Sequence, residues 1–208
     1  MAKNYAELAF TSAIKVMQKK MGSRANYARM EKFSYTNGLT ENEIGFIAQQ
    51  DSFYMASIGE NNFPYIQHRG GSKGFLKVLN PNQIGFIDFV GNKQYITVGN
   101  MATNNNVALI MVDYPARARL KIFAKARIIE LDDNPELYNL LDLSEYKFRP
   151  ERMLIMDVEA YDWNCPQHIT PRYTIEEIND AFHSQRNYAE KLEAEIKELK
   201  HKLKEQGL

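Results

Sequence analysis

The spacing of hydrophobic residues changes twice along the chain. Up to about residue 50, apolar residues recur every three or four positions, which is typical of helices with one buried face. From Ser52 they form short runs, rich in β-branched and aromatic residues and separated by Gly, Asn, Pro and Asp, which is typical of strands joined by turns. Beyond Thr174 the helical spacing returns. Three parts are therefore predicted: an N-terminal helical segment over residues 1–50, a β domain over residues 51–174 and a C-terminal amphipathic helix over residues 175–208.

Three helices are predicted in the N-terminal part: residues 4–21, residues 23–30 and residues 40–50. Gly22 is a natural stop for the first of them, because glycine readily adopts the left-handed conformation that ends a helix. The third has the clearest signal. Thr40 and Glu43 form a capping box, in which each side chain accepts a hydrogen bond from the backbone N–H of the other.

Many short strands follow in the central part. They are predicted over residues 52–58, 63–68, 74–79, 83–89, 94–98, 107–113, 119–130 and 153–162. Short helices are expected over residues 101–106 and 135–141. Strands of this length and spacing favour a barrel or a sandwich. The chain is therefore expected to be mainly β with flanking helices.

The C-terminal part carries a heptad pattern. Apolar residues fall at alternating steps of three and four, with Ile196 and Leu203 at position a, and Leu192 and Leu199 at position d. Gln185 is the one interruption. Isoleucine at a and leucine at d favour two parallel strands, so a coiled-coil-like helix is predicted. The alternative is a helix that packs on its own β domain.

Composition limits the class of protein. The chain has 208 residues, with 26 Lys and Arg against 26 Asp and Glu, so its formal net charge is zero. Nucleic-acid-binding proteins usually show a basic excess. A local basic stretch remains, made of Arg117, Arg119, Lys121, Lys125 and Arg127. Zero net charge argues against a nucleic-acid partner, so none is expected, and a nucleic-acid-binding β-barrel is kept as an alternative.

Cysteine content and hydropathy indicate the compartment. One cysteine, Cys165, cannot form an intramolecular disulfide. No signal peptide is visible, and no apolar run approaches the roughly 18 residues of a membrane span. A cytoplasmic protein with no membrane partner is expected.

Two polar clusters carry the candidate chemistry. The first is residues 69–73, Arg-Gly-Gly-Ser-Lys, and the second is residues 91–94, Gly-Asn-Lys-Gln. Each combines a permissive backbone with a cation, so that amide donors and a positive charge can converge on one anion. This pattern predicts a phosphate site. The alternative is two basic turns exposed to water.

These clusters lie within longer stretches that resemble a known family. The stretches are QHRGGSKGFLKVL, GFIDFVGNKQYITVGN and DYPARARLKIFAKARI, together with GSRANYARME at residues 22–31 and DWNCPQHITPRYT at residues 162–174. Their order resembles that of the pyridoxamine 5'-phosphate oxidase-like FMN-binding proteins, in particular an oxidase-related subgroup. The resemblance implies an FMN-binding split β-barrel. It also implies a homodimer whose flavin lies at the subunit interface.

The resemblance also implies roles for individual residues. Residues expected to contact the FMN phosphate are Arg69, Lys93 and Gln94. Residues expected to lie beside the flavin ring are Asp88, Phe89 and Val90, through their backbone, and Arg119. Two departures matter: the family's Arg-x-x-Leu-Leu-Lys is replaced by HRGGSKGFLK, and its Ser-Arg-Lys cluster becomes Lys-Gln, with one cation fewer. A vitamin B6 substrate therefore does not follow.

A second cluster lies after the last predicted strand. Cys165 and His168 have the spacing of two metal ligands, but a zinc site needs about four, so no metal is predicted. A nucleophilic Cys–His pair lacks an orienting third group. Instead, Trp163, His168 and Arg172 are predicted to cover the flavin pocket and contact flavin or substrate. The alternative is a packed surface loop.

The predicted function is flavin-mediated hydride or electron transfer to an unidentified small molecule, by an FMN-dependent oxidoreductase. NAD(P)H is a candidate donor, and no Gly-rich dinucleotide fingerprint is present, so it is expected to visit as a substrate. The catalytic residues are unknown. A non-catalytic flavin-binding or flavin-storage protein is the main alternative.

Overall fold

The computed structural model describes residues 4–205 and divides into two units. The first contains the chain up to Asp113 together with Arg117–His168. The second contains Tyr114–Ala116 and the chain from Ile169 onward. The predicted three-part division of the chain stays a prediction.

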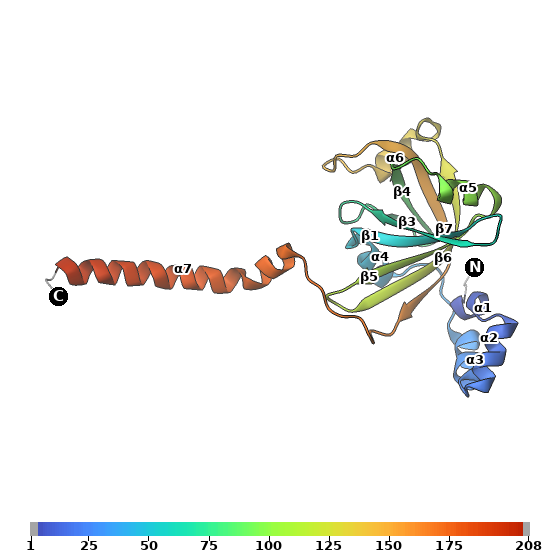
Figure 1. Ribbon diagram of the computed structural model, residues 1–208, viewed down its shortest axis with the longest axis horizontal. Coiled ribbons are helices and arrows are strands. Elements are labelled where there is room, and N and C mark those ends of the chain that lie inside the picture. The colour runs from blue at the N-terminus through green and yellow to red at the C-terminus, as the bar shows by residue number, and fades with distance from the viewer. Residues whose placement is uncertain (1–3, 206–208) are drawn as a thin grey trace. The chain divides into compact units, whose positions relative to one another are not determined.

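The first unit is built on one antiparallel sheet (Figure 1). Its strands are β1 (Ser52–Ile58), β2 (Pro64–Gly70), β3 (Lys77–Asn80), β4 (Gln83–Phe89), β5 (Asn106–Asp113), β6 (Ala118–Ile129) and β7 (Pro150–Asn164). Their order across the sheet is β2-β1-β5-β6-β7-β4-β3. The sheet therefore pairs β4 with the much later strand β7.

The sheet curls so that its two ends meet. Arg69 on β2 forms an ion pair with Asp88 on β4, although four strands separate β2 from β4 in the sheet order. The rings of Phe53 on β1 and Phe86 on β4 lie 5.4 Å apart at 81°, an edge-to-face contact across the interior. Residues with almost no exposed surface fill the enclosed core: Phe53, Met55, Phe75, Leu76, Ile84, Leu109, Met111, Leu120 and Ile122. The predicted mainly β architecture is confirmed.

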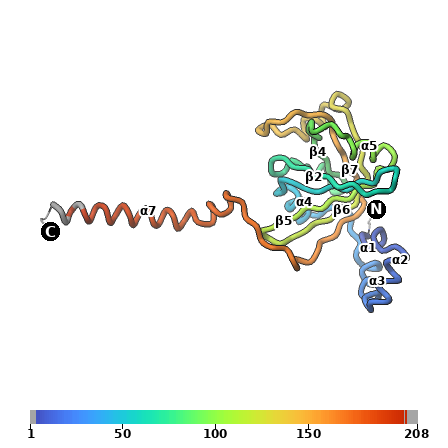
Figure 2. Tube along the Cα trace, viewed as in Figure 1, coloured from blue at the N-terminus to red at the C-terminus, as the bar shows by residue number. Residues whose placement is uncertain are grey.

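Helices flank the sheet. In the first unit these are α1 (Tyr5–Ala9), α2 (Ser12–Lys20), α3 (Arg24–Phe33), α4 (Glu41–Ala48), α5 (Ile96–Thr103) and α6 (Pro135–Leu141), with a 3₁₀ turn at Leu131–Asp133. The second unit contains α7 (Ile175–Glu205). The capping box of α4 is confirmed. The prediction of one helix over residues 4–21 is wrong, because Thr11 takes an extended backbone, with φ −64° and ψ 168°, and separates α1 from α2 (Figure 2).

The predicted strand over residues 94–98 is also wrong. Lys93 and Tyr95 have φ values of 61° and 53°, in the left-handed region, which a strand does not use. The Asn92 side chain accepts a hydrogen bond from the Gln94 backbone N–H at 3.1 Å, which stabilises this turn. The chain therefore leaves β4 through a tight turn and enters α5 at Ile96.

Helix predictions on either side of β5 and β6 have mixed outcomes. The short helix predicted over residues 101–106 is wrong in its bounds, because α5 ends at Thr103 and β5 begins at Asn106. The helix predicted over residues 135–141 is confirmed as α6, where the Asn134 side chain accepts a hydrogen bond from the Leu137 N–H.

The second unit consists mainly of α7. Thr174 and Glu177 form a capping box at its start: the Thr174 hydroxyl accepts from the Glu177 N–H at 3.1 Å, and the Glu177 carboxylate accepts from the Thr174 N–H at 2.7 Å. The predicted C-terminal helix is confirmed, while the side chain of Leu203 lies outside the described residues. Within residues 4–205, no helix is both long and apolar enough to cross a membrane.

Candidate functional site

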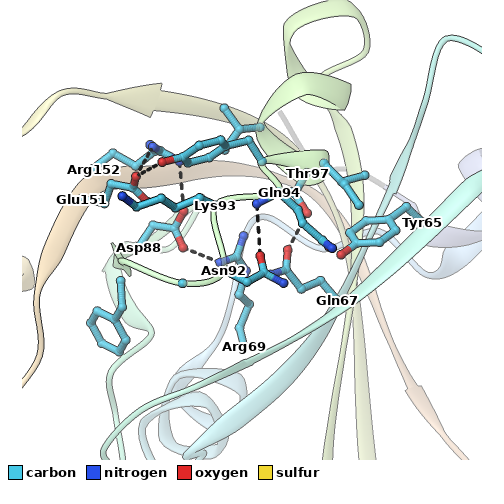
Figure 3. Close-up of a pocket in the computed structure, with 15 residues that line it drawn as sticks. Tyr65, Gln67, Arg69, Asp88, Asn92, Lys93, Gln94, Thr97, Glu151 and Arg152 are labelled. Atoms are coloured by element: carbon cyan, nitrogen blue, oxygen red, sulfur yellow. Dashed lines mark hydrogen bonds and ion pairs between the residues drawn. The ribbon is translucent and has the colours of Figure 1, made fainter.

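A pocket opens where β2 faces β4 and the start of β7 (Figure 3). We call it the β2–β4 pocket. It is lined by Tyr65, Gln67, Arg69, Asp88, Phe89, Glu151, Arg152 and residues 91–98. The space between these side chains, about 380 Å³, includes the open solvent at the mouth of the pocket. Its lining combines several charged side chains with the left-handed turn after β4.

Asp88 lies at the centre of the charged lining. It is 3% exposed, and its carboxylate forms an ion pair with Arg69 from β2. Because the strand register places Asp88 opposite Arg152, the second carboxylate oxygen lies 3.6 Å from the Arg152 guanidinium. Burial raises the pKa of Asp88, and the two guanidinium charges act against this shift. One buried carboxylate is thus shared between two arginines.

The turn after β4 is tied to β7 through Tyr95. Its hydroxyl donates a hydrogen bond to the Glu151 carboxylate at 2.6 Å, which raises the pKa of Tyr95. Glu151 also pairs with Arg152 at 3.1 Å, and the Arg152 guanidinium lies 5.1 Å from the centre of the Tyr95 ring. Cation–π contact and ion pair together hold the turn at the mouth of the pocket.

The pocket lining has more positive than negative charge, and one of its hydrogen-bond donors has no acceptor. Three cations, Arg69, Lys93 and Arg152, face two carboxylates, Asp88 and Glu151, which leaves an excess of one positive charge. The buried Nε of Arg69 has no hydrogen-bond partner among residues 4–205. Lys93 is exposed, and the described part of the chain offers it no ion pair. Such a site can bind an anion, because charged donors strengthen hydrogen bonds to negatively charged oxygen atoms.

The structure brings part of the predicted site together. Arg69, Asp88, Phe89, Lys93 and Gln94 all line the β2–β4 pocket, although they come from two strands and a turn. Val90 follows Phe89 directly and donates its N–H to the Arg149 carbonyl at 2.9 Å, outside the lining. The cofactor roles of these residues stay predictions.

The remaining predicted site residues do not line this pocket. Arg119, on β6, donates to the Cys165 carbonyl at 2.8 Å. His168 is exposed, with a left-handed φ of 63°. Arg172 lies in the second unit, with its guanidinium 4.6 Å from the centre of the Tyr114 ring.

Trp163 has a well-defined partner elsewhere in the first unit. Its indole N–H donates to the Glu43 carboxylate at 2.6 Å, and its ring meets Phe46 edge to face with centroids 4.8 Å apart. Burial would raise the pKa of Glu43, which is 4% exposed, but hydrogen bonds from Thr40 and Trp163 outweigh burial and lower it to about 2. Trp163 therefore ties β7 to the start of α4.

This contact gives a pH-dependent prediction. The folded-state pKa of Glu43 lies below its ordinary value of 4.5, so its stabilising contribution is present above pH 4.5 and is lost as the pH falls toward 2. Replacing Glu43 with glutamine leaves the indole N–H and the Thr40 donors poorly satisfied. We expect Glu43→Gln to cost about 1–3 kcal/mol of unfolding free energy at pH 7 and less at pH 3. Urea denaturation at both pH values measures this.

Glu60→Gln is the matched control, because Glu60 is exposed. It should leave the unfolding free energy unchanged at both pH values. Equal losses for Glu43→Gln at pH 7 and pH 3 contradict the assigned pKa of Glu43.

Several pocket residues were not predicted. Arg152 and Glu151 enter at the start of β7, and Gln67 accepts a hydrogen bond from the Thr97 hydroxyl at 2.8 Å. The available signal was the charged run at residues 149–152, directly before an apolar strand. It points to this pocket only once β7 is known to pair with β4.

No family model and no curated protein matches the chain. Solved structures do match it. HupZ from Group A Streptococcus is 12% identical with a TM-score of 0.49, and the match covers 65% of this chain and 100% of HupZ. A Clostridium acetobutylicum protein related to general stress protein 26, of the pyridoxinephosphate oxidase family, is 16% identical with a TM-score of 0.42, covering 66% and 93%. An FMN-binding protein from Syntrophomonas wolfei is 11% identical with a TM-score of 0.45, covering 71% and 97%.

The names of two of these structures, a pyridoxinephosphate oxidase family protein and an FMN-binding protein, agree with the sequence resemblance, and at these identities the likeness concerns the fold alone. Their names differ in ligand and activity. HutZ from Vibrio cholerae is named a heme storage protein, and another match is named an F420 reductase. The function of this chain therefore has to be argued from its own residues.

Proposed function

We propose that the protein is an FMN-binding oxidoreductase whose β2–β4 pocket holds the flavin phosphate. The observation that carries the proposal is the excess positive charge of this pocket, together with the unpartnered buried Nε of Arg69. Both polar clusters that the sequence resemblance assigns to phosphate binding, around Arg69 and Lys93, contribute to the same lining. A terminal phosphate supplies the negatively charged oxygen atoms that these groups need.

The residues present fit such a group. Arg69, Lys93 and Gln94 would hold the phosphate, helped by the backbone amides of the turn at residues 91–94. Arg152 supplies the cation that the Lys-Gln pair lacks relative to the family pattern. When bound, FMN supplies hydride and electron transfer, while the protein binds and orients it.

A homodimer is part of this proposal. The outer face of β1, β2, β5 and β6 carries partly exposed apolar side chains, namely Tyr54, Ala56, Ile66, Ala108 and Ile110. Lys121 and Phe123 lie beside them, and the Phe123 ring stacks on Tyr5. Tyr54 is 44% exposed and Ile66 is 65% exposed. A contiguous apolar face of this kind marks an interaction surface. We propose that two copies pair through it, as the resemblance implies, and that the flavin lies at their interface.

FMN should bind more tightly than riboflavin, which lacks the phosphate. Losing one or more charge-assisted contacts should cost roughly 1.5–3 kcal/mol, or about ten- to a hundred-fold in affinity. Calorimetric titration of the ligand-free protein with both flavins measures this. Equal affinities would remove the phosphate assignment and leave the fold untouched.

Turnover separates an oxidoreductase from a flavin-storage protein. We propose a cytoplasmic enzyme that acts on a small molecule, with NADH or NADPH as candidate donors. The test is steady-state oxidation of each donor by the FMN-loaded protein with a soluble electron acceptor. If FMN binds and no donor is oxidised, the flavin-storage alternative holds. Salt-dependent oligonucleotide binding with no flavin binding would favour the nucleic-acid alternative.

A further inference from the structure

The apolar seam of α7 is uncovered within its own unit. Five side chains along the seam are between 40% and 52% exposed: Ile178, Phe182, Leu192, Ile196 and Leu199. With Gln185 and Ala189 between Phe182 and Leu192, these positions follow at steps of three and four along a helix of 31 residues, so all of them lie along one stripe. Helices in water gain most of their stability by burying such a stripe. The seam is therefore available to a partner surface of matching shape and period.

We propose that this partner is the α7 helix of a second copy, packed in parallel and in register as a two-stranded coiled coil. This inference does not depend on flavin binding. With Ile196 at position a and Leu192 and Leu199 at position d, the C-terminal half has the residue choice that favours parallel dimers. A second copy carries the same stripe at the same spacing.

Gln185 selects the parallel alignment. It occupies a d position, so its amide is buried when the seam closes. In the parallel alignment Gln185 faces the partner's Gln185, and the two amides can each donate and accept a hydrogen bond. In the antiparallel alignment that matches every a position with a d position, Gln185 faces the partner's Ile196. A buried amide then has no hydrogen-bond partner, which is costly.

The flanking charges permit both alignments. In the parallel pair, Glu195 at position g faces the partner's Lys200 at position e, an attractive contact. In the antiparallel pair, Arg186 faces the partner's Glu193 across the e positions, which is also attractive. Exposed ion pairs contribute little in either case. The alignment therefore depends on the polar layer at Gln185.

Disulfide cross-linking of the full chain tests the alignment. The starting variant is Cys165→Ser, because Cys165 is exposed and is the one cysteine of the sequence. Adding Leu199→Cys puts two thiols in one layer of the parallel coil, so mild oxidation should give a covalent dimer. Adding Glu198→Cys instead puts the thiols outside the seam, since Glu198 lies at a c position with a side chain 65% exposed. We expect cross-linking at position 199 to be at least about tenfold faster than at position 198.

The antiparallel alignment is tested by mixing two variants. There, position 182 of one copy faces position 199 of the other, so Phe182→Cys and Leu199→Cys proteins would form mixed disulfides faster than either forms its own. Preferred mixed disulfides overturn the parallel alignment. If neither position 199 alone nor the mixture of positions 182 and 199 cross-links faster than position 198, the coiled coil itself is overturned.

Gln185→Leu then tests the polar layer. Without the amide, both alignments bury only apolar groups. In this background, mixed disulfides between positions 182 and 199 should therefore form about as fast as disulfides between two copies of position 199. Gln185→Asn keeps an amide in the layer and should retain the parallel preference. If Gln185→Leu cross-links only in the parallel way, the polar layer does not set the alignment.

Discussion

Replacing Arg69 with methionine is expected to lower the unfolding free energy of the ligand-free protein by about 3–5 kcal/mol and to weaken FMN binding at least tenfold. The stability loss arises because Asp88, whose side chain is 5% exposed, then loses the closer of its two ion-pair partners. Arg152 cannot replace it fully, since its guanidinium lies 3.6 Å from the other oxygen and also pairs with Glu151. Urea denaturation and calorimetric titration with FMN measure the two effects.

A second variant separates the two effects. In Arg69→Met/Asp88→Leu both charges of the pair are removed, and replacing a buried ion pair with apolar residues is often close to neutral for stability. We expect stability to return toward that of the unmodified protein while FMN binding stays at least tenfold weaker, because the resemblance assigns Asp88 only a backbone role beside the ring. If the double variant binds FMN normally, the phosphate lies elsewhere, and Lys73 or Lys77 becomes the candidate.

Lys93→Ala is the matched comparison. Lys93 is exposed and forms no ion pair within residues 4–205, so its removal should leave stability unchanged. FMN binding should still weaken about ten- to a hundred-fold, as for loss of one charge-assisted contact. A stability change without an affinity change would indicate a purely structural lysine.

Local patterns in the sequence predicted most of the barrel. Strands β1, β4 and β5 show alternating or continuous apolar runs that end at Gly, Asn or Pro, so their bounds follow from composition alone. The same kind of composition predicts a strand at residues 94–98, and this prediction is wrong. Gln-Tyr-Ile-Thr-Val favours a strand, but the turn at Asn92 and the left-handed Lys93 direct the chain into α5.

The residues of the candidate site that were not predicted from the sequence reach it through contacts between segments distant in sequence. Arg152 reaches Asp88 because β7 pairs with β4, and nothing local to either strand encodes that pairing. Trp163 likewise finds its partner Glu43 at a separation of 120 residues. By contrast, Arg69 and Lys93 were predicted from their own flanking glycines and from the family resemblance. The polar clusters were thus readable from the sequence, whereas the counter-charges that surround them were not.

Two contacts between copies are proposed, the outer face of the sheet and the α7 helix, and they should contribute unequally to the stability of the dimer. The outer face of the sheet should form the flavin-binding dimer, and α7 should reinforce it. Three heptads of apolar seam are marginal alone, because isolated helices of such length are only partly formed in water. Stable protein interfaces bury about 1,200–2,000 Å², and the wide apolar face around Ala108 is better placed to supply this. Deleting residues 175–208 should therefore leave a dimer that binds FMN and unfolds at lower temperature.

Ile66→Arg tests this division. Ile66 is 65% exposed on β2, so an arginine there should not disturb the core, but its charge would be buried in the dimer. In the shortened chain we expect Ile66→Arg to produce a monomer that binds FMN at least tenfold more weakly. In the full chain the same change should leave the copies only weakly associated through α7, in a concentration-dependent way, and FMN binding should be weakened to the same degree. Leu140→Arg on α6, where Leu140 is 60% exposed, should change neither property. Light scattering coupled to size exclusion measures the oligomeric state, and FMN titration of the same samples measures the affinity. If the shortened chain is monomeric with Ile66 intact, α7 creates the dimer.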